Sequence, residues 1–103
     1  AKEDPAVTAR LHDWLRRLAA GDIDRSQLAP SFSSFETPAL VADDKKTFGP
    51  LGPPKTFVFQ GQTERDGVTS YTYAVTFASV RMIVQFGLDA QGKIARFGYG
   101  RTR

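Results

Sequence analysis

The sequence predicts an α+β fold in which N-terminal helices pack on a curved four-stranded antiparallel sheet. Two observations carry this prediction. Apolar residues recur at every third or fourth position in the first half of the chain, and at every second position after residue 54. The first period is typical of an amphipathic helix, and the second of a strand with one buried face. We therefore expect a single domain over residues 1–103, in which residues 1–54 form the helical part and a connector and residues 55–103 form an antiparallel β-meander.

Composition narrows the classes of protein that remain. The chain has 103 residues, which suffices for one domain, and its 41% of hydrophobic residues is too many for a disordered segment. The net charge of +3 is compatible with an anionic partner, or with no more than a soluble surface. Because the chain has no cysteine, disulfides, thiol nucleophiles and cysteine-ligated metals are excluded.

The first helix is predicted over residues 5–20. Asp4 is suited to cap it, Pro5 to open its first turn, and Gly21 to end it in a left-handed conformation. Its apolar stripe consists of Val7, Leu11, Trp14, Leu15 and Leu18.

Shorter elements are expected before the sheet. A turn of helix is predicted up to Leu28, with Pro30 as its stop. Residues 31–36 form a polar segment that two phenylalanines, Phe32 and Phe35, are expected to anchor to the core. A second helix is predicted over residues 38–48, ended by Gly49, and residues 49–54 form a rigid breaker rich in Gly and Pro.

Four strands are predicted, over residues 55–64, 68–77, 80–88 and 93–101, because alternation is combined there with aromatic and β-branched residues. The apolar face, which the first helix would cover, carries Phe57, Phe59, Tyr71, Tyr73, Val75, Phe77, Val80, Met82, Val84, Phe86, Leu88, Ala95, Phe97 and Tyr99. The opposite face is polar and small, with the exception of Ile83, and carries Thr72, Ala74, Thr76, Arg81, Gln85, Arg96, Gly98 and Gly100. On that face the two glycines either let a partner approach closely or only permit curvature of the sheet.

The turns predict a register. At Asp66 and Gly67, a three-residue loop that pairs Glu64 with Val68 keeps all aromatic residues on one face, whereas a two-residue turn reverses the first strand. The three-residue loop is therefore expected, with Phe59 beside Tyr73.

The other two turns are predicted in the same way. A tight turn at residues 78–79 pairs Phe77 with Val80, but Ala-Ser is a poor turn sequence and a wider connection is expected. A four-residue loop at residues 89–92 pairs Leu88 with Lys93 and Phe86 with Ala95.

Several of these features together resemble the NTF2-like, cystatin-like superfamily. They are the capped helix with Trp14, the Gly21-Asp22 pair after it, the segment from Phe48 to Phe59, and the ending Leu88-Asp89-Ala90-Gln91-Gly92-Lys93-Ile94. The most similar type is the small bacterial accessory domain of unknown function that accompanies secreted serine hydrolases and penicillin-binding-like proteins. The resemblance implies a helix wrapped by a curved sheet with a conical cavity between them. The chain begins without Met, which indicates either a processed N-terminus, as in a secreted or periplasmic protein, or a cut chain.

Members of that superfamily include isomerases, cyclases and dehydratases as well as binding modules. This chain departs from the enzymes because every carboxylate is predicted at a helix end, on a polar helix side or in a hairpin tip, so that no inward-facing base is expected. The one histidine, His12, borders the apolar stripe and is interpreted either as a cavity-mouth residue or as a boundary residue. We expect no metal, no cofactor and no membrane span. Nucleic acid is not expected as a partner, because the aromatic residues lie on the face opposite the one where the arginines are expected to gather, namely Arg81, Arg96, Arg101 and Arg103.

The sequence therefore predicts a non-catalytic accessory or binding domain. It would hold a small apolar ligand between helix and sheet, or bind a protein partner or a second copy of itself through the sheet. The candidate pocket, whose residues can equally fill a core, consists of Trp14, Phe59, Tyr71, Tyr73, Phe86, Phe97, Tyr99 and His12. The alternative is a small isomerase or cyclase that uses His12 or a carboxylate.

Overall fold

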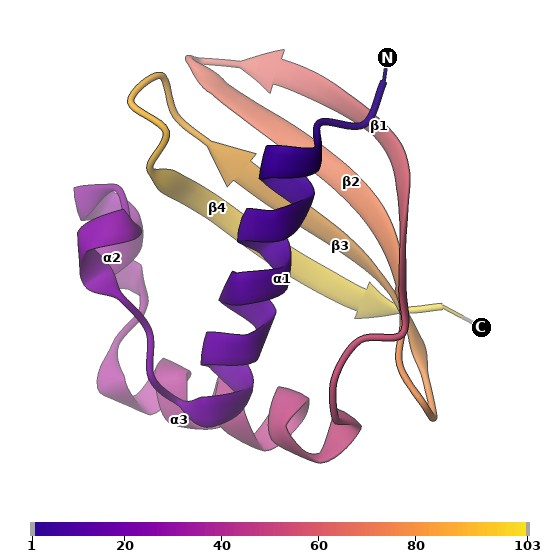
Figure 1. The fold of residues 1–103 in the computed structure, drawn as a ribbon. Helices are drawn as coiled ribbons and strands as arrows, with labels where there is room; N and C mark the ends of the chain where they lie inside the picture. Colours follow the sequence, from indigo (N-terminus) through magenta and orange to yellow (C-terminus); the bar gives the residue numbers. More distant parts are fainter. Residues whose placement is uncertain (1, 103) are drawn as a thin grey trace.

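The computed structural model describes residues 2–102, so Ala1 and Arg103 of the predicted domain lie outside the described residues. The helices are α1 (Pro5–Ala20), α2 (Pro30–Phe35) and α3 (Pro38–Phe48), with short 3-10 helices at Arg25–Gln27 and Gly49–Leu51. The strands are β1 (Thr56–Arg65), β2 (Val68–Thr76), β3 (Arg81–Leu88) and β4 (Ile94–Arg101). They form one antiparallel sheet in the order β1-β2-β3-β4 (Figure 1). The predicted α+β class is confirmed, and each strand begins and ends within one residue of its predicted bounds.

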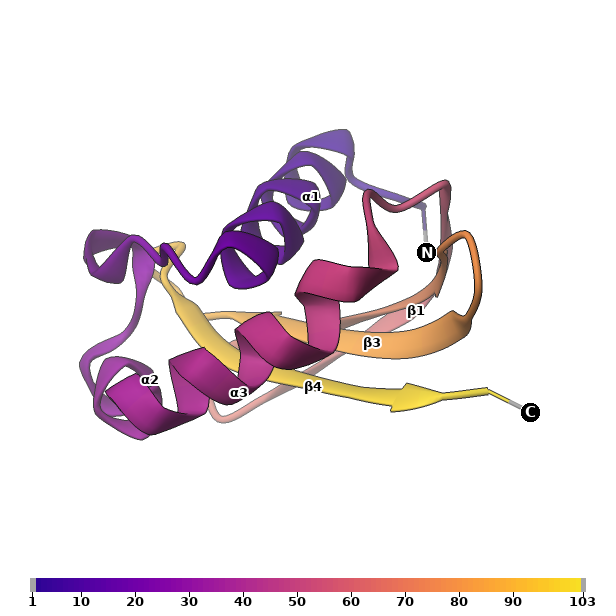
Figure 2. The same ribbon diagram turned by 90° about the horizontal axis from the view of Figure 1, so that it is seen from below.

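The helices lie on one side of the sheet. α1 crosses the sheet's inner face, and α3 runs beside β4 on the same side (Figures 1 and 2). The outer face carries no helix from residues 2–102 (Figure 2). A single helical layer on a single sheet buries one face of each, which is the simplest arrangement for a chain of this length.

α1 forms as its local sequence predicts. The Asp4 carboxylate accepts a hydrogen bond from the Ala6 backbone N–H at 2.9 Å, and Gly21 takes the left-handed conformation with φ of 68°. The buried residues of α1 are the predicted stripe, Val7, Leu11, Trp14, Leu15 and Leu18. Burial of such side chains stabilises the fold by roughly 1.5–3 kcal/mol each relative to full exposure, so this stripe is the main link between helix and sheet.

Helix α2 was not predicted. Pro30 begins this helix as its first residue and does not merely end the preceding turn. The preceding turn stops because Leu28 forms a parallel bridge with Ile94 of β4, and the Ala29 N–H donates to the Ile94 carbonyl at 2.9 Å. Of the two predicted anchors only Phe32 is buried, whereas Phe35 is 63% exposed.

The first hairpin differs from the prediction at its turn but not in its core. Asp66 and Gly67 form a two-residue turn with φ of 54° and 79°, so that Arg65 lies opposite Val68. Phe59 nevertheless pairs with Tyr73 as predicted, because a β-bulge between Phe59 and Gly61 adds one residue to β1. The bulge reverses the face change that the tight turn imposes, and both phenylalanines of β1 keep to the inner face.

The last hairpin is shifted by two residues from its predicted register. Phe86 pairs with Phe97, not with Ala95. A shift of two positions leaves Phe97 and Tyr99 on their expected face. An irregularity after Gly87 accounts for one of the two residues, and there Leu88 pairs with Ile94, which turns to the inner face and becomes a core residue with 1% exposure.

The turn before β4 is held by Asp89, whose side chain accepts hydrogen bonds from the N–H groups of Gln91 and Lys93, each at 2.9 Å. At the middle hairpin, Phe77 donates its N–H to the Val80 carbonyl at 2.8 Å. The expected wider connection is therefore wrong, and the tight turn forms despite its poor turn sequence.

Candidate functional site

The residues predicted to line a cavity between helix and sheet lie mostly in a filled core. Tyr73 and Phe86 are 0% exposed and Trp14 is 2% exposed. The Trp14 ring instead contacts the rings of Phe32 and Phe97, each with a centroid separation of 5.9 Å. Because Tyr73 and Phe86 are completely buried, neither side chain borders a cavity that could admit a ligand.

The hydroxyl of Tyr73 is also engaged within the protein. It lies 2.8 Å from the Thr8 hydroxyl on α1 and shares a hydrogen bond with it. Burial raises the pKa of Tyr73 above its usual range. This hydroxyl therefore links α1 to β2, rather than facing a ligand.

The remaining candidates do not surround one cavity. Phe59, Tyr71 and Phe97 are half-buried and pack against the core. Tyr99 is 41% exposed and lies against the Phe48 ring, with a centroid separation of 4.9 Å. His12 is the one predicted pocket residue that lines a cleft on the helical side.

That cleft is an apolar hollow of about 320 Å³ at the C-terminal half of α1. Four residues of α1 contribute to it at helical spacing, and the other walls come from the end of α3, the connector and the β2–β3 turn. Its lining consists of His12, Leu15, Arg16, Ala19, Phe48, Gly52, Pro53, Pro54 and Phe77.

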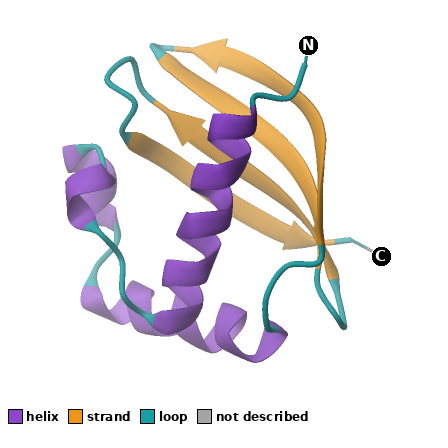
Figure 3. Cartoon of the chain, viewed as in Figure 1, coloured by secondary structure: helices purple, strands orange, loops and turns teal. Residues whose placement is uncertain are grey.

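The connector wall follows from backbone geometry. α3 ends at Phe48 as predicted, but Gly49 is right-handed and continues into a 3-10 helix. The reversal occurs at Gly52, whose φ of 71° is left-handed, and the chain then runs as a loop into β1 (Figure 3). Pro53 and Pro54 fix their own φ angles, so this loop forms a stiff apolar wall.

The polar groups of the cleft are His12 and Arg16. The His12 ring packs on the Phe57 ring with a centroid separation of 5.5 Å. The Arg16 Nη2 donates to Asp13 Oδ1 at 2.6 Å, and its side chain is 61% exposed. The cleft lining includes no carboxylate.

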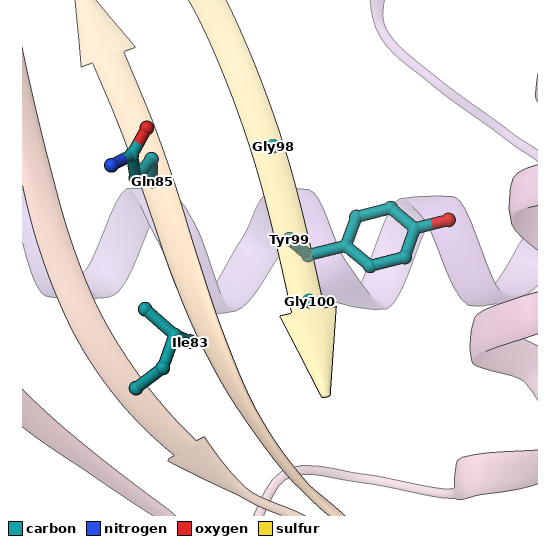
Figure 4. Close-up of a pocket in the computed structure, with 5 residues that line it drawn as sticks. All are labelled: Ile83, Gln85, Gly98, Tyr99 and Gly100. Carbon is teal, nitrogen blue, oxygen red and sulfur yellow. The ribbon is translucent and has the colours of Figure 1, made fainter. Parts of the chain in front are cut away.

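A second hollow, of about 280 Å³, lies on the outer face of the sheet (Figure 4). Ile83 and Gln85 stand on β3 beside it, and the ring of Tyr99 extends away from β3. A Cβ atom added at Gly98 or Gly100 would meet nothing within 4 Å, so this part of the sheet is bare backbone.

Sequence reasoning missed part of the apolar character of the outer face. Val58 is 53% exposed on β1 and belongs to the cross-strand row Val58, Ala74, Ile83 and Gly100. Ala74 in the middle of this row is only 1% exposed. Because successive side chains of a strand alternate between faces, Val58 is expected on the other face of β1 from Phe57 and Phe59. This alternation was the signal in the sequence for an exposed apolar residue on the outer face.

A buried pair of carboxyl groups was also missed. Glu36 caps the C-terminus of α2 and is 2% exposed, and Asp44 in α3 is 5% exposed. Burial and then the charge of Asp44 raise the pKa of Glu36 to about 7, and burial raises the pKa of Asp44. The signal for Asp44 is its position four residues after Leu40 and four before Phe48, on the apolar side of α3.

The acid pair is shielded, not exposed to a cleft. The Arg25 guanidinium donates to the Glu36 carbonyl at 2.6 Å and to the Ser33 carbonyl at 2.7 Å, which ties α2 to the preceding turn. Neither Glu36 nor Asp44 lines the apolar cleft or the outer hollow. Within residues 2–102, no three His, Asp or Glu side chains come together as a metal site.

Comparison with protein-family models, curated protein sequences and solved structures finds no significant match to this chain. The resemblance to the NTF2-like superfamily therefore stays a prediction, beside a fold class that the structure confirms. None of the helices within residues 2–102 is long and apolar enough to cross a membrane.

Proposed function

We propose that this chain is a non-catalytic accessory domain of the NTF2-like type that binds a small apolar molecule. The observation that carries the proposal is the apolar cleft between α1, Phe48, the proline connector and Phe77. Its volume of about 320 Å³ lies at the lower end of the range for small-molecule sites, which are usually apolar with a few polar groups. The ligand would lie at one end of the helix–sheet layer, because the centre of that layer is filled.

The cleft supports binding better than catalysis. An isomerase or cyclase needs a base within reach of the substrate. The carboxyl groups with raised pKa, Glu36 and Asp44, are buried outside the cleft. His12 is the only imidazole that lines the cleft, and its ring packs on Phe57.

Ala19→Leu tests the cleft directly. Side chains on a helix lean toward its N-terminus, so a leucine at position 19 would cover the surface over Leu15 and Arg16 and fill the cleft. Ala20→Leu is the matched control, because Ala20 is exposed and does not line the cleft. Small apolar compounds, lipid fragments and cell-wall fragments would be screened by their effect on the melting temperature.

A saturable rise in the melting temperature is expected for wild type and Ala20→Leu, and not for Ala19→Leu. If no compound raises the melting temperature of wild type, or if Ala19→Leu retains the rise, the cleft is not the binding site.

A protein partner on the outer sheet face is the second candidate. It is favoured by the exposed Val58 in the same row as Ile83 and the bare Gly100. Sedimentation of wild type and Ile83→Asp at rising concentration tests whether the partner is a second copy. A wild-type dimer that Ile83→Asp dissociates is expected, and a wild-type monomer at millimolar concentration would exclude self-association.

A further inference from the structure

The apolar cleft has a charge asymmetry that narrows the class of ligand. Both of its ionisable lining residues, His12 and Arg16, are cationic when protonated, and no carboxylate balances them within the lining. We propose that the cleft takes a small molecule with an apolar body and a single carboxylate, and that Arg16 binds the carboxylate. This inference rests on the proposed function, because it names the ligand class of the same cleft.

The Arg16 guanidinium has N–H donors that its bond to Asp13 does not use. A guanidinium carries five N–H donors, and Arg16 uses Nη2 for its bond to Asp13. The same Asp13 carboxylate also accepts from the Arg17 Nε at 2.9 Å. Two arginines thus share one carboxylate as their acceptor, so Asp13 by itself does not neutralise both. A ligand carboxylate can pair with Arg16 without displacing Asp13.

The depth of the cleft requires an apolar body. Leu15, Phe48 and Phe77 form its base and are 2%, 1% and 4% exposed. Pro53 and Pro54 add no side-chain donor or acceptor. A polar body would lose its hydrogen bonds to water there without gaining replacements, whereas an alkyl or aryl body would lose nothing.

The geometry orients the ligand in one way. The apolar groups line the base and the cationic groups stand on the exposed side of α1, so the carboxylate would point to solvent. An amine in the same place would meet the positive charge of Arg16 and bind more weakly.

Three probes with alkyl chains of the same length distinguish the contribution of the apolar body to the affinity from that of the head group. Octanoate, octanol and octylamine would be titrated calorimetrically, below their micellar concentrations, into wild type, Arg16→Gln and Arg17→Gln. Arg17→Gln is the matched control, because Arg17 also binds Asp13 but does not line the cleft. Octanoate is expected to bind wild type most tightly. Its affinity should fall roughly tenfold in Arg16→Gln and stay within about twofold in Arg17→Gln, as a charge-assisted contact implies.

The outcomes distinguish the two levels of the proposal. Equal binding of octanoate and octanol, tighter binding of octylamine, or an equal loss in both arginine variants would overturn the carboxylate assignment and leave the apolar cleft as a binding site. Absence of saturable binding by all three probes would overturn the carboxylate assignment and the apolar cleft together. Circular dichroism melting curves verify that both variants are folded.

Discussion

Glu36 and Asp44 are two neighbouring carboxyl groups buried in the protein interior, at the end of α2 and in the middle of α3, and the charge of Asp44 acts directly on Glu36. Two buried carboxylates repel each other when both are ionised, so the pair is most stable when it shares one proton. The Glu36 Oε1 and Asp44 Oδ2 atoms have no hydrogen-bond partner from residues 2–102. The packing of α2 on α3 is therefore tied to a proton that normal solution conditions can remove.

Stability should fall as pH rises through this pair's titration. The pKa of Glu36 is raised from 4.5 to about 7, so between these values the folded protein holds a proton that the unfolded chain has lost. The stabilising contribution is thus fully present below pH of about 4.5 and lost as pH rises through about 7. A shift of this size corresponds to about 3 kcal/mol in the free energy of unfolding. Urea unfolding between pH 5 and 8 measures it, and a flat profile would contradict a shared proton.

Glu36→Gln should remove this pH dependence. The amide donates a hydrogen bond to Asp44 as the protonated carboxyl does, but it cannot ionise. We expect the variant to match wild type near pH 5 and to exceed its free energy of unfolding by about 2 kcal/mol at pH 8. Glu64→Gln is the control, because Glu64 is exposed on β1 and should leave the profile unchanged. Equal profiles for both variants would show that another group titrates.

Gly61 should be sensitive to substitution because of its backbone conformation. Its φ of 142° is a conformation that side chains with a Cβ rarely adopt, and it sits at the bulge that sets the register of β1. Gly61→Ala is expected to lower the free energy of unfolding by about 1–3 kcal/mol. Gly98→Ala provides the comparison, because its Cβ would enter open space on the outer face. Chemical denaturation of both variants measures the difference, which an equal loss would contradict.

The Thr8–Tyr73 hydrogen bond should couple α1 to the sheet. Tyr73 is fully buried, so Thr8→Val leaves its hydroxyl without this partner and should cost about 1–3 kcal/mol. Tyr73→Phe and the double variant complete a cycle, in which a coupling energy of about 1 kcal/mol is expected. Additive effects in unfolding measurements would mean that water replaces the lost partner.

Short-range signals in the sequence determined the helix and strands that depend only on neighbouring residues. Asp4 and Gly21 delimit α1 through capping and a left-handed glycine, and alternation defines the four strands within one residue. These signals need only neighbours along the chain, because hydrogen bonds at helix ends and the two faces of a strand are set by backbone geometry.

Tertiary contacts decided the registers and α2. The bulge before Gly61 and the two-residue shift of β4 both preserve the inner face, so burial favours several registers equally and the sequence cannot separate them. Helix α2 begins at Pro30 because the preceding residues are held by Ile94, which is remote in sequence.

The candidate site was also determined partly by the sequence and partly by the tertiary structure. The sequence by itself determined that His12 borders the apolar stripe of α1 and that the aromatic residues share one face of the sheet. Only the tertiary structure decided that those aromatic side chains fill the core, and that the open space lies where Phe48, Pro53 and Phe77 meet α1. The physical reason is that an empty volume is left over after packing. It depends on the joint placement of segments far apart in the chain, whereas the periodicity of a segment reports only which of its faces is buried.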